Sequence, residues 1–352
     1  MALWIGREYL RRKREKSDAK ADKRIAVLAS PASHYSLCKA TNVTGLGEGS
    51  HEDCGLCVDE LHNRATIKHY HKPQANGEGL HFVRCHENGN IDVIALEDTI
   101  RALHNGKGIN RFIIFLNEGT ILTGAMDSTA EVGSLIRKLR EEWKSQVDFY
   151  LHVDAAYGGF IYPFLMPAGQ WAFKVPEVNS LTADPYKMGQ APMACGLFLC
   201  RKGFQGYIQR PTGYVQDQLD DTLCGSRSGA YAAACWTVIK SEGFINFQRM
   251  HQQSVIVAGK LHVELSKIAR IKLLPQQLNM VAFVLPSDLG HLELRCMEEY
   301  LIRPYRLMWN LMSLDPGNTD VHVNRIVRFI ITRNVKQEWL DESIKIIKKI
   351  VG

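Results

Sequence analysis

The stretch "DFYLHVDAAYGGF" (residues 148–160) joins an apolar strand to a carboxylate, Asp154, and then to a run of small residues. Alanines and glycines at this point let a flat molecule approach the backbone closely. A second stretch, "SLTADPYKMGQAPMACG" (residues 180–196), is a short strand that ends by presenting Lys187. A lysine leaving a buried strand either extends its ammonium group to the surface or meets a partner there.

Strands and helices alternate on both sides of these two stretches. Strand-like runs are expected at 25–31, 80–85, 111–117, 148–156, 178–183 and 196–201, and helices at 33–43, 93–106 (closed by a glycine) and 128–145. Continuous apolar strands alternating with helices predict an α/β fold with a mostly parallel sheet covered on both faces. In such sheets, functional side chains collect at the carboxyl ends of the strands.

The pattern changes at about residue 240. The run 245–268 is helical, 279–286 and 325–332 are strand-like, and 338–352 is an amphipathic helix. We therefore predict a large domain over residues 1–239 and a smaller C-terminal α+β domain over residues 240–352.

Composition excludes several classes of protein. The 352 residues are 45% hydrophobic and 23% charged, as in ordinary globular proteins. Most of the net charge of +6 comes from the run Arg11–Arg24, which holds eight basic and three acidic residues and no aromatic residue to stack on bases. The sequence therefore predicts neither nucleic-acid binding nor a membrane span. Nine scattered cysteines favour reduced thiols and a cytoplasmic location.

Asp154 and Lys187 together suit one cofactor. A lysine amine forms a Schiff base with the aldehyde of pyridoxal phosphate, and a carboxylate keeps the pyridine nitrogen protonated, which makes the ring an electron sink. Alone, Asp154 could be a helix cap and Lys187 a surface residue. As a pair on successive strand ends, they favour the cofactor.

Three motifs in order carry a resemblance to a known family. "SHYSLCKA", "HVDAAYGGF" and "ADPYKMGQAP", with "TLCGSRSGAYAAACW" after them, resemble the pyridoxal-phosphate-dependent group II amino-acid decarboxylases, above all the tyrosine/aspartate decarboxylase branch. The resemblance implies the aminotransferase-like fold (fold type I), a homodimer with its site at the subunit boundary, and decarboxylation of a small L-amino-acid substrate.

The resemblance also implies roles for seven residues. Lys187 is expected to form the Schiff base, Asp154 to face the pyridinium nitrogen, and Ala156 and His34 to pack on the two faces of the ring. Without the resemblance to this family, the sequence favours a structural role for His34, as a histidine of the core whose hydrogen bonds are satisfied.

The remaining three are Thr120, near the phenolic oxygen of the cofactor, Asp184, on its phosphate side, and Arg328, which is expected to take the substrate carboxylate. Without the resemblance to this family, we would expect an arginine on a strand of the small domain, such as Arg328, to lie on the surface.

Ile121 replaces the second threonine of a Gly-Thr-Thr turn beside Thr120, and the sequence departs from the family pattern in three further ways. Tyr186 replaces the histidine that commonly precedes the lysine. A Gly/Ser-rich phosphate loop and an N-terminal segment, which the family places before the first helix, are expected to be missing from this chain. Tyr214 is the one nearby candidate for a proton donor on a mobile loop.

The third departure is an expected insertion at residues 48–80. It contains Cys54-x-x-Cys57 and, with His81 counted, five histidines. One cysteine pair without a second clean pair favours a solvated loop, and we expect no metal site.

Three functions stay open from the sequence. The chain is an amino-acid decarboxylase, or a catalytically impaired homologue that acts as a dimer partner or scaffold, or a carbon–carbon aldehyde lyase. The last group shares the "HVDA" strand and the lysine strand, but "KMG" here differs from its "KYG".

Overall fold

The computed structural model describes residues 1–15, 23–46, 56–59, 64–67, 76–121, 123–193, 195–214, 216, 218–302, 308–312 and 324–352. The helices are α1 (Ala2–Glu15), α2 (Ser36–Val43), α3 (Val93–Lys107), α4 (Thr129–Glu142), α5 (Tyr162–Leu165), α6 (Pro185–Met188), α7 (Ala230–Leu265), α8 (His291–Cys296) and α10 (Gln337–Val351). The strands are β1 (Ala26–Ala29), β2 (Leu56–Asp59), β3 (Arg64–Ile67), β4 (Gly79–Phe82), β5 (Arg111–Asn117), β6 (Asp148–Asp154), β7 (Val178–Ala183), β8 (Leu197–Cys200), β9 (Arg210–Pro211), β10 (Leu219–Asp220), β11 (Lys272–Leu273), β12 (Met280–Val284), β13 (Met308–Met312) and β14 (Asn324–Ile330).

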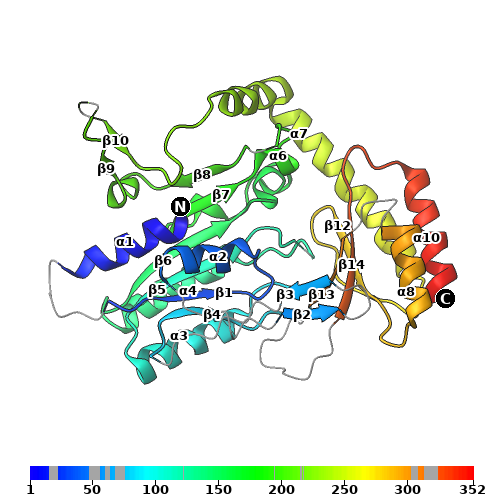
Figure 1. The fold of residues 1–352 in the computed structure, drawn as a ribbon, viewed down its shortest axis with the longest axis horizontal. Helices are drawn as coiled ribbons and strands as arrows, with labels where there is room; N and C mark the ends of the chain where they lie inside the picture. Colours follow the sequence, from blue (N-terminus) through cyan, green and yellow to red (C-terminus); the bar gives the residue numbers. More distant parts are fainter. Residues whose placement is uncertain are drawn as a thin grey trace.

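The main sheet has six strands in the order β4-β1-β5-β6-β7-β8 (Figure 1). The first five are parallel, and β8 runs antiparallel to β7. The prediction of a mostly parallel sheet is therefore confirmed, with one antiparallel edge strand. The chain reverses between β7 and β8 through the short helix that carries Lys187.

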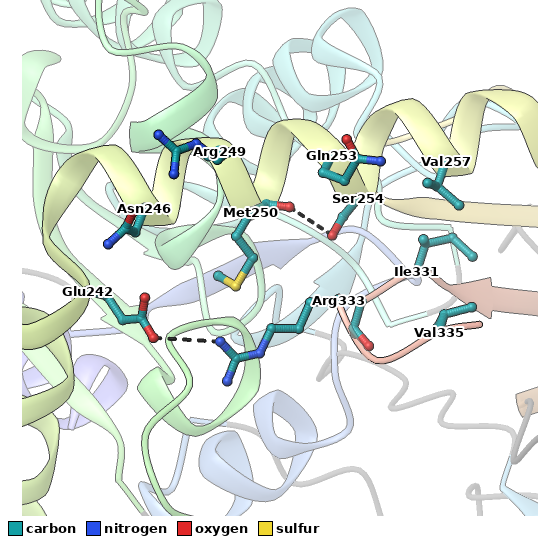
Figure 2. A pocket seen from close by; sticks show the side chains of 11 residues that line it. Glu242, Asn246, Arg249, Met250, Gln253, Ser254, Val257, Ile331, Arg333 and Val335 are labelled. Carbon is teal, nitrogen blue, oxygen red and sulfur yellow. Dashed lines mark hydrogen bonds and ion pairs between the residues drawn. The ribbon is translucent and has the colours of Figure 1, made fainter. Parts of the chain in front are cut away.

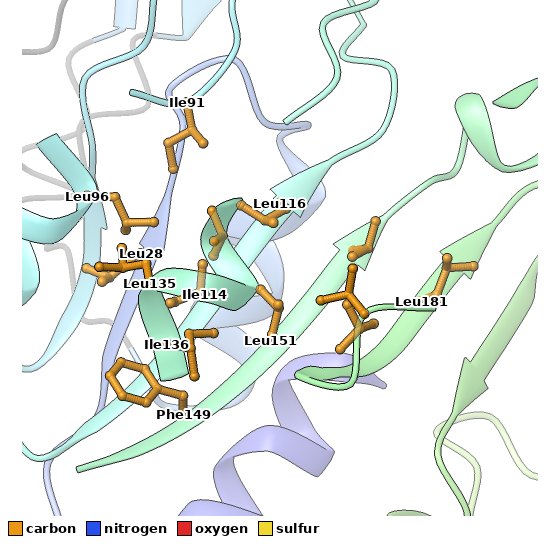
Figure 3. Packing of buried hydrophobic residues seen from close by; sticks show 14 of the residues in the cluster. Leu28, Ile91, Leu96, Ile114, Leu116, Leu135, Ile136, Phe149, Leu151 and Leu181 are labelled. Atoms are coloured by element: carbon orange, nitrogen blue, oxygen red, sulfur yellow. The ribbon is translucent and has the colours of Figure 1, made fainter. Parts of the chain in front are cut away.

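Strand β5 shows why helices cover both faces. All seven of its residues are buried, and successive side chains point to opposite faces. Ile114 belongs to a core that also contains Ile136 of α4 (Figure 3). Phe112 belongs to the same core, whereas Ile113 packs in a second core with α1. Two buried cores hold the sheet between them.

Capping side chains and a glycine with a positive φ determine where helices α3 and α4 begin or end. Ser128 caps α4 by accepting a hydrogen bond from the Glu131 amide, as its place in the sequence predicted. Helix α3 begins after Asp92, whose carboxylate accepts from two amides of the first turn. The predicted end of α3 was slightly wrong: the helix runs through Gly106 to Lys107, and Gly108, at a φ of 71°, ends it.

The C-terminal part is built on a four-stranded antiparallel sheet in the order β11-β12-β14-β13. Its core lies between this sheet and helices α7, α8 and α10, and includes Leu261, Phe283, Val327 and Ile347. Helix α7 crosses the predicted boundary at residue 240 and is interrupted at Gly243, where φ is 64° and ψ is 175°. The boundary itself stays a prediction.

The expected insertion at residues 48–80 is not wholly a loop. Strands β2 and β3 form an antiparallel pair within it, and residues 79–80 begin β4 of the main sheet. His81 lies in β4 and bonds the Gly77 carbonyl through Nε2 at 2.9 Å. Cys54 lies outside the described residues, and Cys57 lies in β2.

None of the described helices is long and apolar enough to cross a membrane. No group of three or more histidine, cysteine, aspartate or glutamate side chains could hold a metal ion in the part of the chain that the structure describes.

Candidate active site

The carboxyl ends of three neighbouring strands meet at one cavity. Asn117 ends β5 and pairs in register with Asp154, which ends β6 and pairs with Thr182 of β7. All three line a cavity of about 590 Å³. All seven predicted site residues also line it, namely His34, Thr120, Asp154, Ala156, Asp184, Lys187 and Arg328. The fold therefore brings together residues that are nearly 300 positions apart in the chain.

Asp154 is held at the end of β6 by the turn that follows. Its Oδ1 accepts a hydrogen bond from the Ala156 amide at 3.1 Å. Burial raises the pKa of Asp154, while this amide and the charge of Lys187 act in the opposite direction. A cationic group bound beside this carboxylate would favour its ionised form. The carboxylate is thus suited to face a protonated ring nitrogen.

Lys187 lies on α6, one turn after β7. Its Nζ is 3.1 Å from Asp184 Oδ2 and 5.7 Å from the centre of the Tyr186 ring. The side chain is 31% exposed, so its amine is neither sealed in the core nor extended into solvent. The surface interpretation of this lysine is therefore wrong, because the amine lies in a cavity with two carboxylates on its walls.

His34 lies on the loop before α2 and is half-buried. Its Nδ1 is 2.8 Å from the Ser36 hydroxyl, and its ring lies against Tyr35. Burial, and then the positive charge of Lys187, lower the pKa of His34. The imidazole is therefore neutral at neutral pH and lines the cavity as a flat, uncharged ring.

Thr120 follows β5 on a turn that the glycine before it makes possible. Gly119 has a φ of 97°, and a Cβ there would lie 2.9 Å from the Tyr157 ring. The Thr120 hydroxyl accepts from the Ala125 amide at 3.0 Å and lies 2.9 Å from the Thr123 hydroxyl. Ile121 occupies the cavity wall where the family has a second threonine.

Arg328 reaches the cavity from the antiparallel sheet. It lies on the central strand β14, opposite Ala282 of β12, and is only 3% exposed. Burial lowers the pKa of Arg328 to about 10, and the nearby Tyr157 opposes this shift. The guanidinium is therefore still charged at neutral pH, and the surface interpretation of this residue is wrong.

Several residues that line this cavity were not predicted from the sequence. Tyr157 donates to Asn279 Oδ1 at 2.7 Å, and Asn279 Nδ2 donates to the Ile331 carbonyl at 2.6 Å. This chain of bonds ties the turn after β6 to the antiparallel sheet. Tyr157 stood within the "HVDAAYGGF" motif, but Thr332, which also lines the cavity, has no signal in the sequence.

The two tyrosines singled out from the sequence differ in placement. Tyr186 lines the cavity, and burial raises its pKa further above neutrality. It is therefore protonated at neutral pH. Tyr214 is 88% exposed and is absent from the lining of this cavity.

Two buried carboxyl groups lie behind the cavity wall. Asp127 accepts from the Ile91 amide at 2.6 Å and from the Asn117 amide at 2.7 Å. Glu118 accepts from the Thr129 hydroxyl at 3.1 Å, and its own amide donates to the Asp154 carbonyl. Burial raises the pKa of Asp127 to about 6 and that of Glu118 to about 8.

The raised pKa of Glu118 makes the contribution of this residue to stability fall as pH rises. Between pH 6 and 8 the folded protein keeps the Glu118 proton that the unfolded chain has lost, so each pH unit costs up to about 1.4 kcal/mol of unfolding free energy. We expect Glu118→Gln to remove this contribution, so that the unfolding free energy from urea curves falls less steeply, or rises more steeply, with pH across that range than in the wild type. Glu141→Gln, on the exposed face of α4, is the matched control. An unchanged slope in Glu118→Gln would contradict the shift.

The family model for the pyridoxal-dependent decarboxylase conserved domain matches residues 5–285. The chain belongs to this family. The match confirms the predicted family and its cofactor, pyridoxal phosphate. The residues around the cavity fit that group, because an amine, a partly buried carboxylate and a neutral ring line a single space.

Individual relatives agree with this assignment. The chain is 32% identical over 179 residues to a probable L-tyrosine/L-aspartate decarboxylase of Methanothermobacter thermautotrophicus, covering 49% of each chain. It is 31% identical over 243 residues to a tryptophan decarboxylase of Clostridium sporogenes, covering 69% of this chain and 48% of that one. The chain spans about half the length of these curated relatives.

Solved structures show the same fold. The glutamate decarboxylase of Lactobacillus brevis superposes with a TM-score of 0.74 at 17% identity, over 99% of this chain and 72% of that one. The fold-type-I prediction is confirmed.

Proposed function

We propose that this chain binds pyridoxal phosphate in the 590 Å³ cavity and decarboxylates an L-amino acid there. The observation that carries the proposal is that Asp154, at the end of β6, and Lys187, on the helix α6 that follows the adjacent strand β7, line one cavity. When bound, the cofactor supplies an electron sink for the pair of electrons released as the bond to the carboxylate breaks.

Some of the residues that line the cavity are assigned to cofactor binding and one to substrate binding. Lys187 would hold the cofactor through its aldehyde, and the charge of Asp154 would favour a proton on the ring nitrogen. Ala156 and His34, which line the same cavity, would pack against the ring.

Arg328 is placed to bind the carboxylate of the amino acid, because it is the buried cation that the antiparallel sheet contributes to the cavity. Thr120 is assigned to the phenolic-oxygen side of the cofactor and Asp184 to its phosphate side. Both line the cavity, which supports these assignments.

The direct test is release of labelled carbon dioxide from carboxyl-labelled tyrosine, aspartate, glutamate, tryptophan and histidine. We expect release from at least one of them that requires added pyridoxal phosphate. Cofactor binding without release from any amino acid would favour the second function, an impaired homologue that serves as a dimer partner or scaffold. Release of an aldehyde from a β-hydroxy amino acid such as threonine, without carbon dioxide, would instead favour the carbon–carbon lyase.

We further propose a homodimer that resides in the cytoplasm. Strands β9 and β10 and the start of α7 stand away from the main sheet (Figure 1). Large apolar side chains are exposed there, including Leu223 and Trp236, each 64% exposed. A second copy that covered these side chains would remove them from water. Seven of the cysteines in the described part of the chain are free thiols, as a reducing compartment maintains them.

The dimer predicts a strong effect of one substitution. Trp236→Glu places a charge in the proposed interface, and we expect it to convert dimers into monomers in analytical ultracentrifugation. Ile94→Glu is the matched control, because Ile94 is 74% exposed on α3, on another part of the surface. A wild-type chain that sediments as a monomer would contradict the proposal.

A further inference from the structure

A second cavity of about 560 Å³ lies between α7 and the loop that follows β14 (Figure 2). Its lining comes from residues 242–257 of α7 and residues 331–335 of the loop. Thr332 is the one residue that also lines the cofactor cavity. The second cavity is therefore a neighbour of the first with its own set of side chains, and none of the roles proposed above uses it.

The charged groups of this cavity are arranged around Arg333. Figure 2 shows Arg333 extending from the loop toward Glu242 of α7, with Met250 above it. The ion pair between Arg333 and Glu242 is long, at 3.6 Å, and the two side chains are 50% and 32% exposed. An exposed pair of this kind contributes little stability, so a better anionic partner can replace Glu242.

Arg249 adds a second guanidinium to the lining. It is exposed on α7 and forms no ion pair with any residue that the structure describes. Two arginines against the single carboxylate of Glu242 leave the lining with a net positive charge. The cavity therefore favours an anion.

The rest of the lining is apolar or neutral. Met250, Val257, Ile331 and Val335 supply the apolar surface. The hydroxyl of Ser254 is already directed to the Met250 carbonyl at 3.0 Å. A cavity with a mostly apolar wall and a few charged groups is typical of sites for small organic molecules.

We propose that this cavity binds a small organic carboxylate that has an apolar body. The carboxylate takes the place of Glu242 as the partner of Arg333, with Arg249 at the rim, and the body lies against Met250 and Ile331. A bidentate carboxylate–arginine contact is stronger than the long pair that it replaces. The proposal does not depend on the decarboxylase activity.

Calorimetric titration with hexanoate, on protein loaded with pyridoxal phosphate, tests this site. We expect saturable binding that 1-hexanol, with the same apolar chain and no charge, does not show. Arg333→Gln should weaken the hexanoate affinity at least about tenfold, and Arg249→Gln should weaken it less. Glu242→Gln should tighten binding severalfold, because it removes the carboxylate that competes for Arg333.

The opposite signs at positions 242 and 333 separate a binding site from a structural ion pair. If the pair only stabilised the fold, both variants would lower the melting temperature and neither would tighten binding. Lys187→Ala should leave hexanoate binding unchanged, since Lys187 lines the other cavity. Equal affinity for hexanoate in the wild type and Arg333→Gln, or loss of binding in Lys187→Ala, would overturn the proposal.

Discussion

Lys187→Ala is expected to abolish both the visible absorption of the lysine-bound cofactor and the release of carbon dioxide. The amine of Lys187 is the group in the cavity that can bind the cofactor aldehyde covalently, and it lies 3.1 Å from Asp184. Loss of a covalent catalytic group removes a whole step, so we expect activity to fall by at least about 1,000-fold. Titration with pyridoxal phosphate, followed by its visible spectrum, measures the first effect.

The control for this variant is another lysine outside the cavity. Lys202→Ala removes an exposed amine just after β8 and should leave both the spectrum and the activity unchanged. If the visible band of Lys187→Ala equalled that of Lys202→Ala, another lysine would hold the cofactor and the assignment of Lys187 would be wrong.

Asp154→Asn is expected to bind the cofactor but to lose turnover. The amide has the shape of the carboxylate and its oxygen can still accept the hydrogen bond of the Ala156 amide. Without the negative charge, however, the proton on the ring nitrogen would lose the carboxylate that stabilises it, and the electron sink would be weakened. Removing an electrostatic group of this kind costs at least about 100-fold in kcat.

The matched control is Asp98→Asn, on the exposed face of α3. It changes the net charge by the same amount far from the cavity and should leave kcat as it was. A visible band in Asp154→Asn together with unchanged kcat would show that the carboxylate has no part in the chemistry. Loss of the band as well would show that it acts in binding.

Much of the large domain could be predicted because its signals are local. The strand at 111–117 has five consecutive apolar residues at 112–116 and matches β5 residue for residue, and Ser128 caps the helix where the sequence placed it. Asp154 and Lys187 were found because parallel strands bring their carboxyl ends to one edge. Periodicity and turn chemistry are sufficient for such elements.

The rest depends on contacts between distant segments. Arg328 could be placed on a strand, but only the pairing of β14 with β12 buries it and directs it to the cavity. The same holds for Thr332, which lines both cavities, and for Glu118, whose raised pKa follows from burial under α4. Strand pairing across more than 40 residues has no local signature. The β2–β3 pair and the antiparallel β8 join segments much closer in the chain, and neither was predicted from the sequence.

The central claim is that Lys187 holds the cofactor, and chemical trapping tests it most directly. The protein loaded with pyridoxal phosphate is reduced with borohydride, digested and analysed by mass spectrometry. The account predicts a stable phosphopyridoxyl group on the peptide that contains Lys187 and on no other peptide in stoichiometric amount. The same group on a different lysine, or its absence from every peptide at saturating cofactor, would contradict the account.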